Sequence, residues 1–244
     1  MNDKHQTLKL ETTPGYTSVG KFGLQDYRRM FKARGWKLPL HYFLEAHLFD
    51  LLYNTDTHHW HPKGLFPVMP ENFLNGEFYM CSWTGEIKQA FHFLHKHLGP
   101  EFQNYHFIDI GCGKGKVVLV WKMLAEKCGS KQAITGIDYI PQFIDISIKN
   151  QSLIFGQERE PLFEVADATA YDYYKSRSKL IVYLYNPFNE IIFETVLRKI
   201  EHSKNIVVYN NPVHEDVLVK NGYRKIKSRM GFHPNASTMI FANY

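Results

Sequence analysis

Cysteine is scarce in this 244-residue chain, and the few cysteines present are far apart. Cys81, Cys112 and Cys128 are an odd number and include no C-x-x-C spacing. Such a pattern is not that of a disulfide framework or a zinc site. We therefore expect no disulfide scaffold and no bound metal.

Long apolar runs are also lacking. The first ten residues, MNDKHQTLKL, are polar, unlike the apolar centre of a signal peptide. No uninterrupted apolar run reaches the roughly 18 residues that a membrane-spanning helix needs. We therefore expect a cytoplasmic protein with no membrane partner.

A strong excess of one charge is missing as well. The chain has 29 Lys and Arg against 24 Asp and Glu, a net charge of +5. The basic residues gather in two stretches, 21–37 and 224–229, and such runs are usually solvated faces. An excess this small does not establish a nucleic-acid partner, and we expect none. The sequence leaves the oligomeric state open.

From about residue 104, strand and helix patterns alternate along the chain. Short β-rich runs at 105–110, 133–138, 162–167, 179–188 and 205–210 are separated by helical patterns, and an antiparallel pair closes the chain. This order predicts an α/β fold, a Rossmann-like, doubly wound, mostly parallel seven-stranded sheet with helices on both faces.

The first hundred residues differ in character. Helical patterns at 24–35, 40–52 and 85–98 flank a Pro- and Gly-rich segment at 53–80. We expect residues 1–100 to form a tail, an N-terminal helical cap and a lid loop, and residues 101–244 to form the ligand-binding domain. The expected lid aromatics are Tyr53, Trp60, Phe66, Phe73, Phe78, Tyr79 and Trp83.

The segment FIDIGCGKGK (107–116) places three glycines directly after the first strand. Glycine permits the sharp turn from strand to helix and lets a ligand lie against the main chain. The spacing of Gly111, Gly113 and Gly115 is G-x-G-x-G, which is neither the dinucleotide fingerprint nor a phosphate-binding Walker loop. On its own, this turn is compatible with several nucleotide ligands.

Three aspartates at successive strand ends narrow the choice of ligand. Asp109 precedes the glycines, where a negative charge disfavours a phosphate and favours a cation. Asp138 ends the second strand, where a carboxylate accepts hydrogen bonds from a ribose diol. Asp167 ends the third strand, within reach of an adenine amino group. An aspartate at such a place is often only a helix cap, but three in this order favour a cationic nucleoside.

The order FIDIGCGKGK, GIDYI, EVADAT and LYNPF resembles the class I S-adenosylmethionine (SAM)-dependent methyltransferases over residues 82–244. The resemblance implies SAM as the cofactor and methyl transfer as the activity. It also implies methionine contacts at the glycine-rich turn, ribose contacts at the second strand end and adenine contacts nearby. The residues concerned are Asp109, Gly111, Cys112 and Gly113, then Asp138, then Tyr139, Asp167 and Ala168.

The segment WTGEIKQAF (83–91) is similar to the lead-in helix of Dot1-like lysine methyltransferases. This similarity implies that Thr84 and Glu86 approach the methionine end of SAM.

Asn186, Pro187 and Phe188 end the fourth strand and are the expected acceptor-orienting residues, with Asn186 also near the cofactor. Methyl transfer is an in-line displacement, so an amine lone pair must be aimed at the methyl group. An amide oxygen, a carbonyl and an aromatic ring supply what this requires. The segment resembles the Asn-Pro-Pro-aromatic motif of amino-group methyltransferases but lacks the second proline. The alternative is an ordinary turn in which Asn189 caps the next helix.

Histidines leave two further alternatives open. His214 follows the fifth strand and would serve as a general base if the acceptor were a hydroxyl group. His58, His59 and His61 have no cysteine or acidic partner at metal-ligand spacing, although Asp56 is close. We expect these three imidazoles to be exposed or to face the substrate in a lid loop.

The leading hypothesis is therefore a SAM-dependent methyltransferase acting on an amine, carried either by a protein lysine or by a small molecule. One alternative is O-methylation of a small molecule with His214 as base. Others are an NAD-dependent oxidoreductase, because Asp138 would also suit the ribose of NAD, and a SAM-binding protein without turnover. The sequence does not name the acceptor.

Overall fold

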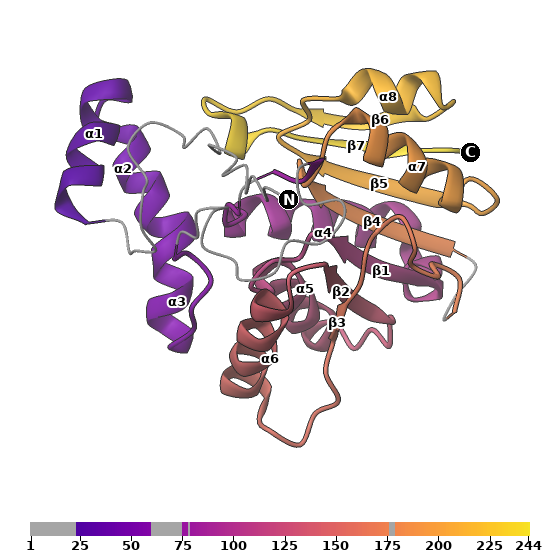
Figure 1. Ribbon diagram of the computed structural model, residues 1–244, viewed down its shortest axis with the longest axis horizontal. Helices are drawn as coiled ribbons and strands as arrows, with labels where there is room; N and C mark the ends of the chain where they lie inside the picture. The colour runs from indigo at the N-terminus through magenta and orange to yellow at the C-terminus, as the bar shows by residue number, and fades with distance from the viewer. Residues whose placement is uncertain (1–22, 60–74, 78, 176–178) are drawn as a thin grey trace, which may run out of the picture.

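A seven-stranded sheet forms the centre of the molecule in the computed structural model, which describes residues 23–59, 75–77, 79–175 and 179–244. The strand order is β3-β2-β1-β4-β5-β7-β6 (Figure 1). The first five strands are parallel, and β7 is antiparallel to both β5 and β6. The strands are β1 (Tyr105–Ile110), β2 (Ile134–Asp138), β3 (Phe163–Val165), β4 (Lys179–Tyr185), β5 (Asn205–Asn210), β6 (Arg224–Arg229) and β7 (Thr238–Ala242). The predicted doubly wound, mostly parallel sheet is confirmed.

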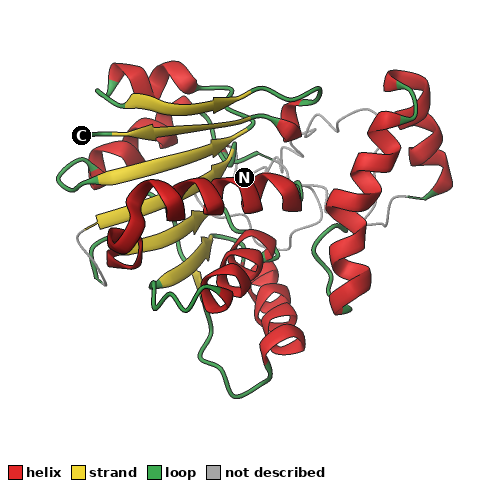
Figure 2. Ribbon diagram, turned by 180° about the vertical axis from the view of Figure 1, so that it is seen from behind, coloured by secondary structure: helices red, strands yellow, loops and turns green. Residues whose placement is uncertain are grey.

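Helices cover both faces of the sheet (Figure 2). The core on one face joins the sheet to α4 (Thr84–Leu98), α5 (Lys116–Lys127) and α6 (Pro141–Phe155). The core on the other face joins it to α7 (Glu190–Ile200) and α8 (Glu215–Lys220). The central strands β1 and β5 are buried along their whole length, which explains why they read as continuous apolar runs. Two short 3-10 helices, η4 (Gly99–Asn104) and η5 (Pro234–Ala236), complete these connections.

Helix α4 belongs to this core, although the sequence placed it in the N-terminal part. Its apolar positions Ile87, Phe91 and Leu94 are buried. The Phe91 ring lies 5.0 Å from the ring of Trp121 in α5, measured between centroids. The boundary expected at residue 100 therefore falls after a helix that packs with the sheet, and the core begins at about Thr84.

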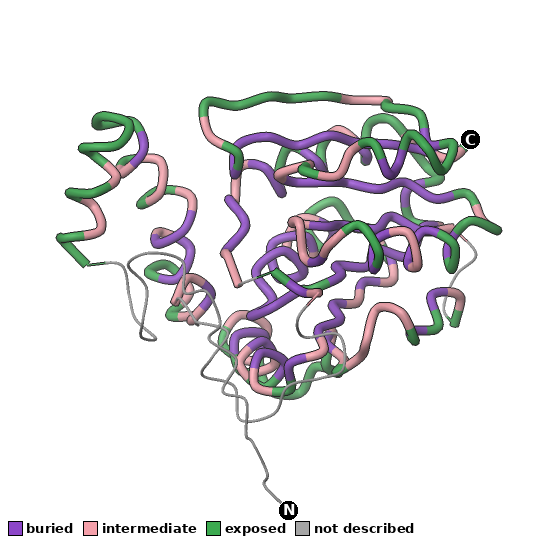
Figure 3. The backbone as a smooth tube through the Cα atoms, turned by 45° about the horizontal axis from the view of Figure 1, so that its top comes forward, coloured by how far each residue is buried: buried purple, intermediate pink, exposed green. Residues whose placement is uncertain are grey.

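The N-terminal helices stand to one side of the sheet and form an arm (Figure 1). Its elements are α1 (Leu24–Arg34), α2 (Lys37–Tyr42), the π-helical turn η1 (Phe43–His47) and α3 (Leu48–Tyr53). Helix α1 has no buried residue. Figure 3 shows its backbone in the colours of exposed and intermediate residues, whereas the central strands have the colour of buried ones. The expected helical cap is thus present as this arm. In the described part of the chain, no helix has the length and apolarity needed to cross a membrane.

Candidate active site

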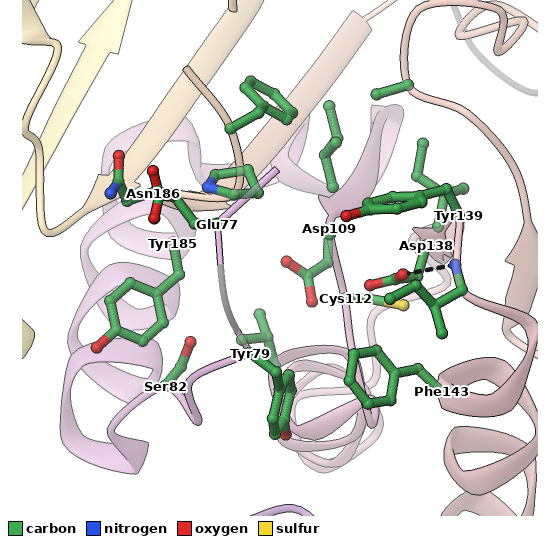
Figure 4. A pocket seen from close by; sticks show the side chains of 18 of the residues that line it. Glu77, Tyr79, Ser82, Asp109, Cys112, Asp138, Tyr139, Phe143, Tyr185 and Asn186 are labelled. Atoms are coloured by element: carbon green, nitrogen blue, oxygen red, sulfur yellow. Dashed lines mark hydrogen bonds between the residues drawn. The ribbon is translucent and has the colours of Figure 1, made fainter. Parts of the chain in front are cut away.

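A pocket of about 930 Å³, open solvent at its mouth included, lies at the carboxyl ends of β1, β2 and β4. The chain leaves β1 and β4 in opposite directions at this point, and such a switch is where doubly wound sheets bind ligands. Figure 4 shows the side chains around this pocket. The expected site residues that line it are Asp109, Gly111, Cys112, Asp138, Tyr139, Ala168, Asn186, Pro187 and Phe188.

The glycine-rich turn is held between two other segments. All three glycines have positive φ, with +73° at Gly111 and +52° at Gly113. A Cβ atom on Gly111 would lie 2.7 Å from Cβ of Pro187, and one on Gly113 would lie 2.2 Å from the ring of Tyr79. Only glycine lets the turn pack this closely, so these positions serve the packing of the pocket walls as well as the approach of a ligand.

Asp109 ends β1 with its carboxyl group in the pocket (Figure 4). The side chain is 3% exposed, and its Oδ2 atom has no hydrogen-bond donor among the described residues. Burial, reinforced by the nearby charge of Asp138, raises the pKa of Asp109 well above its usual value. Because buried polar atoms in proteins are normally paired, this oxygen is placed to receive a donor, and a cationic one most favourably.

Asp138 binds the glycine-rich turn to the second strand end. Its Oδ2 accepts from the Gly113 amide at 2.9 Å, and its Oδ1 accepts from the Ile140 amide at 2.9 Å. Burial raises the pKa of Asp138 to about 6. The Tyr139 backbone amide is a third donor to this carboxylate. A carboxylate has about four acceptor sites, so the group can hold the turn and still accept from a ligand hydroxyl. Gly113, whose amide makes one of these bonds, does not itself line the pocket.

The third aspartate is placed differently from the expectation. Asp167 does not line the pocket, and its Oδ1 accepts from the backbone amide and the hydroxyl of Thr169, both at 2.7 Å. This side chain therefore shapes the turn after β3, because a short Asx turn satisfies the local backbone. Its neighbours Ala166 and Ala168 provide the pocket wall instead.

The Asn186–Phe188 segment forms a tight turn at the end of β4. Asn186 adopts a left-handed conformation, with φ of +43°, which asparagine tolerates better than most residues. Its Oδ1 accepts from the Tyr209 hydroxyl at 3.1 Å, and the carbonyl of Pro187 accepts from the Glu77 amide at 2.9 Å. The alternative role for Asn189 is also present, because its side chain accepts from the Ile192 amide and caps α7.

Thr84, Glu86 and His214 were expected near the reaction but do not line the pocket. The Thr84 hydroxyl donates to the carbonyl of Glu45 in the arm. The Glu86 carboxylate accepts from Arg229 and from Thr238, because this face of α4 turns toward β6 and β7.

The imidazole of His214 lies 3.2 Å from the Glu190 carboxylate, measured from Nδ1 to Oε1. A base for the acceptor must be within reach of it, and His214 does not line the pocket.

The histidine loop is likewise engaged within the protein. The His58 ring bonds to the buried carboxylate of Asp50, and His59 Nδ1 lies 2.5 Å from Asp56 Oδ1. The His58 side chain is only 9% exposed, contrary to the expected exposed imidazole. His61 lies outside the described residues, as do Trp60, Phe66, Phe73 and Phe78. Among the residues that the structure describes, no three His, Cys, Asp or Glu side chains are grouped so as to hold a metal.

Several pocket residues had no signal in the sequence. Glu77 comes from the Pro- and Gly-rich segment, which has no periodicity that would place it. Tyr185 lines the pocket from the end of β4, and its hydroxyl is buried without a partner among the described residues. Ser82 also lines the pocket without belonging to a recognisable motif, and so does Lys116, the last residue of the segment 107–116, whose side chain was not singled out.

Comparison with known proteins bears on the fold. No family model and no curated protein matches the sequence. Magnesium protoporphyrin IX methyltransferase from Synechocystis, solved with bound SAM, is 13% identical over 65% of this chain and 77% of its own, with a TM-score of 0.47.

An amino pentose methyltransferase from Micromonospora echinaspora, also solved with SAM, is 7% identical over 67% of this chain and 92% of its own, with a TM-score of 0.47. An N-methyltransferase from Bradyrhizobium japonicum is 10% identical over 65% of this chain and 95% of its own, with a TM-score of 0.44. Likenesses this distant say nothing about the substrate. The strand order, with antiparallel β7 between β5 and β6, shows a doubly wound, Rossmann-like fold.

Proposed function

We propose that the chain is a SAM-dependent methyltransferase that transfers a methyl group to an amine, carried by a protein lysine or by a small molecule. The observation that carries this proposal is the buried, unpaired Oδ2 of Asp109 beside the glycine-rich turn. A carboxylate at this point suits the ammonium group of a methionine and repels the phosphates of a dinucleotide.

The other residues of the pocket fit the rest of SAM. The Asp138 carboxylate keeps an acceptor site for a ribose hydroxyl next to the turn. Tyr139, Ile140, Phe143 and Ala166 give an apolar wall beside it, suited to an adenine ring. When bound, SAM supplies a methyl group made electrophilic by its sulfonium.

This chain's own residues bind and orient the acceptor. The Asn186 amide oxygen is fixed by Tyr209 and keeps a second lone pair for an N–H group of the acceptor. The rings of Phe188 and Tyr185 bound the same part of the pocket and reduce the access of water. Held in this way, the amine nitrogen presents its lone pair to the methyl carbon in line with the breaking bond.

The alternatives lack an observation of comparable strength. O-methylation needs a base at the hydroxyl group, and His214 is paired with Glu190 outside the pocket. An NAD enzyme would place a pyrophosphate against the glycine-rich turn, next to the Asp109 carboxyl group. A protein that only binds SAM would have no use for an acceptor-orienting amide at the end of β4.

The test is methyl transfer from SAM to molecules in a cell extract, followed by mass spectrometry. The expected result is a molecule that gains one methyl group on an amine with the wild-type protein. Asn186→Ala should lower turnover far more than SAM affinity, because its amide contacts the acceptor. A variant that loses SAM affinity while keeping turnover at saturating SAM would contradict this role for Asn186, and a methylated hydroxyl would contradict the amine assignment.

A further inference from the structure

The segment 75–77 is fixed across the turn that ends β4. The Glu77 amide donates to the carbonyl of Pro187 at 2.9 Å, and Gly76 pairs with Phe188 as an antiparallel bridge. Asn189 donates two hydrogen bonds of 2.9 Å to Asn75. Its backbone amide donates to the Asn75 carbonyl, and its side-chain amide donates to Asn75 Oδ1. Glu77 is therefore held by its main chain at the acceptor side of the pocket.

This arrangement changes what the Asn186–Phe188 turn offers to an amine. The carbonyl of Pro187, one of the two expected acceptors, already accepts from the Glu77 amide. Asn186 Oδ1 has one lone pair left after its bond from Tyr209. The Pro187 carbonyl likewise keeps one lone pair, but both of these acceptors are neutral, whereas a protonated amine forms its strongest hydrogen bond with a charged acceptor.

The Glu77 carboxylate is placed to be that charged acceptor. It lines the same pocket as Asn186 and Asp109, and Figure 4 shows it beside Asn186, on the side away from Tyr139 and Asp138. Glu77 is exposed, and it takes part in none of the ion pairs formed within the described part of the chain. Its charge is thus available to a ligand that enters from solvent.

We propose that Glu77 binds the acceptor and selects a positively charged amine. This inference rests on the proposed methyltransferase function. The ammonium ion of the acceptor donates to the Glu77 carboxylate and to Asn186 Oδ1, and it gives one proton to Glu77. The free lone pair then forms the N–C bond while the S–C bond breaks, with its electron pair going to sulfur. The products are the methylated ammonium and S-adenosylhomocysteine, and Glu77 returns its proton to solvent.

The probe is sinefungin, a SAM analogue with a primary ammonium in place of the methyl sulfonium, compared with S-adenosylhomocysteine, which has no group there. Titration calorimetry gives the ratio of the two affinities for each protein. Because a charge-assisted bond at a partly exposed site is lost, Glu77→Gln should lower the preference for sinefungin about three- to tenfold. The affinity for S-adenosylhomocysteine should stay unchanged, and Glu77→Asp should retain part of the preference.

Glu158→Gln is the matched control, because Glu158 is an exposed glutamate in the loop after α6 and does not line the pocket. Its affinity ratio should equal that of the wild type. If Glu77→Gln binds both ligands like the wild type, the inference about Glu77 is overturned while the proposed function stands. If the wild type binds neither ligand, the proposed function itself fails.

Discussion

Asp109 is the residue at which binding and stability are opposed. Its carboxyl group is buried beside Asp138 at the end of β1, and Oδ2 lacks a donor among the described residues. A buried polar atom left unpaired costs about 1–3 kcal/mol of folding free energy. A ligand ammonium that pairs with this carboxylate would recover that free energy on binding.

Replacing Asp109 with Asn should therefore stabilise the protein alone at neutral pH, by about 1–3 kcal/mol. Burial raises the pKa of Asp109 above its value in the unfolded chain. The folded protein thus loses stability as the pH rises from about 4, the unfolded pKa, through the folded pKa. Asn does not titrate, so its advantage should be absent near pH 4 and below and should grow as the pH rises toward the folded pKa. Chemical denaturation of both proteins from pH 4 to pH 8 measures the difference.

The same variant should lose the ligand. Thermal stabilisation by S-adenosylhomocysteine should be present in the wild type and nearly absent in Asp109→Asn, because the amide cannot neutralise an ammonium. A variant that is less stable than the wild type at pH 7, or one that binds the ligand equally well, would show that Asp109 has another role.

The glycine-rich turn between β1 and α5 is the element that the sequence described best. Its positive φ values and its position at the strand ends match the expectation. The close approach of Tyr79 to Gly113 was not predictable, because Tyr79 comes from a segment 34 positions earlier without strand or helix periodicity. The turn is therefore constrained from two sides, by a distant side chain and by the pocket.

Gly113→Ala should disrupt the site more than the backbone change alone explains. Its Cβ atom would lie 2.2 Å from the Tyr79 ring, whereas a Cβ on Gly129 would meet nothing within 4 Å. Both glycines have positive φ, +52° and +71°, so Gly129→Ala controls for the strain of placing alanine in this region. We expect about 1 kcal/mol of destabilisation for Gly129→Ala with unchanged ligand affinity. Gly113→Ala should also lower the affinity for S-adenosylhomocysteine at least tenfold. Equal affinities in the two variants would refute the packing argument.

Other elements show where sequence patterns stop being informative. The strands at 105–110 and 205–210 have the predicted bounds because continuous apolar runs fix them. The helix expected at 40–52 instead runs from Lys37 to Tyr53 with a π-helical turn at Phe43–His47, which apolar spacing does not reveal. Asp167 closes its own turn by accepting from the Thr169 amide, and a strand-end aspartate reads the same in the sequence whether it meets a ligand or closes such a turn.

At the scale of the whole molecule, the second half of the arm and the residues directly after it are attached to the glycine-rich turn and to the start of the following helix. Lys114 is fully buried and donates to the Asp56 carboxylate at 3.0 Å. Lys116 donates to the Glu45 carbonyl, and the Glu45 carboxylate accepts from the Gly85 amide at 2.6 Å. Helix α1 has no buried residue; its Tyr27 hydroxyl bonds to His47 Nδ1 within the arm at 2.8 Å, and its Met30 packs against the small cluster of Leu38, Trp83 and Ala236. The sequence could not predict these attachments because each joins residues far apart in the chain.

Removing residues 1–37 should therefore leave the cofactor site intact. We expect a modest fall in melting temperature, retained binding of S-adenosylhomocysteine and impaired use of the acceptor. Removing residues 1–57 should instead abolish binding, because it leaves the Lys114 ammonium buried without Asp56, at a cost of a few kcal/mol. If the shorter truncation also loses binding, the first part of the arm belongs to the core.

Titration calorimetry of the whole chain with SAM and, separately, with NAD tests the proposed cofactor most directly. SAM should bind at one site per chain, Asp138→Ala should weaken this binding by about 1–3 kcal/mol, and NAD should produce no heat of binding. Tight binding of NAD together with no binding of SAM would contradict the assignment of SAM as the cofactor.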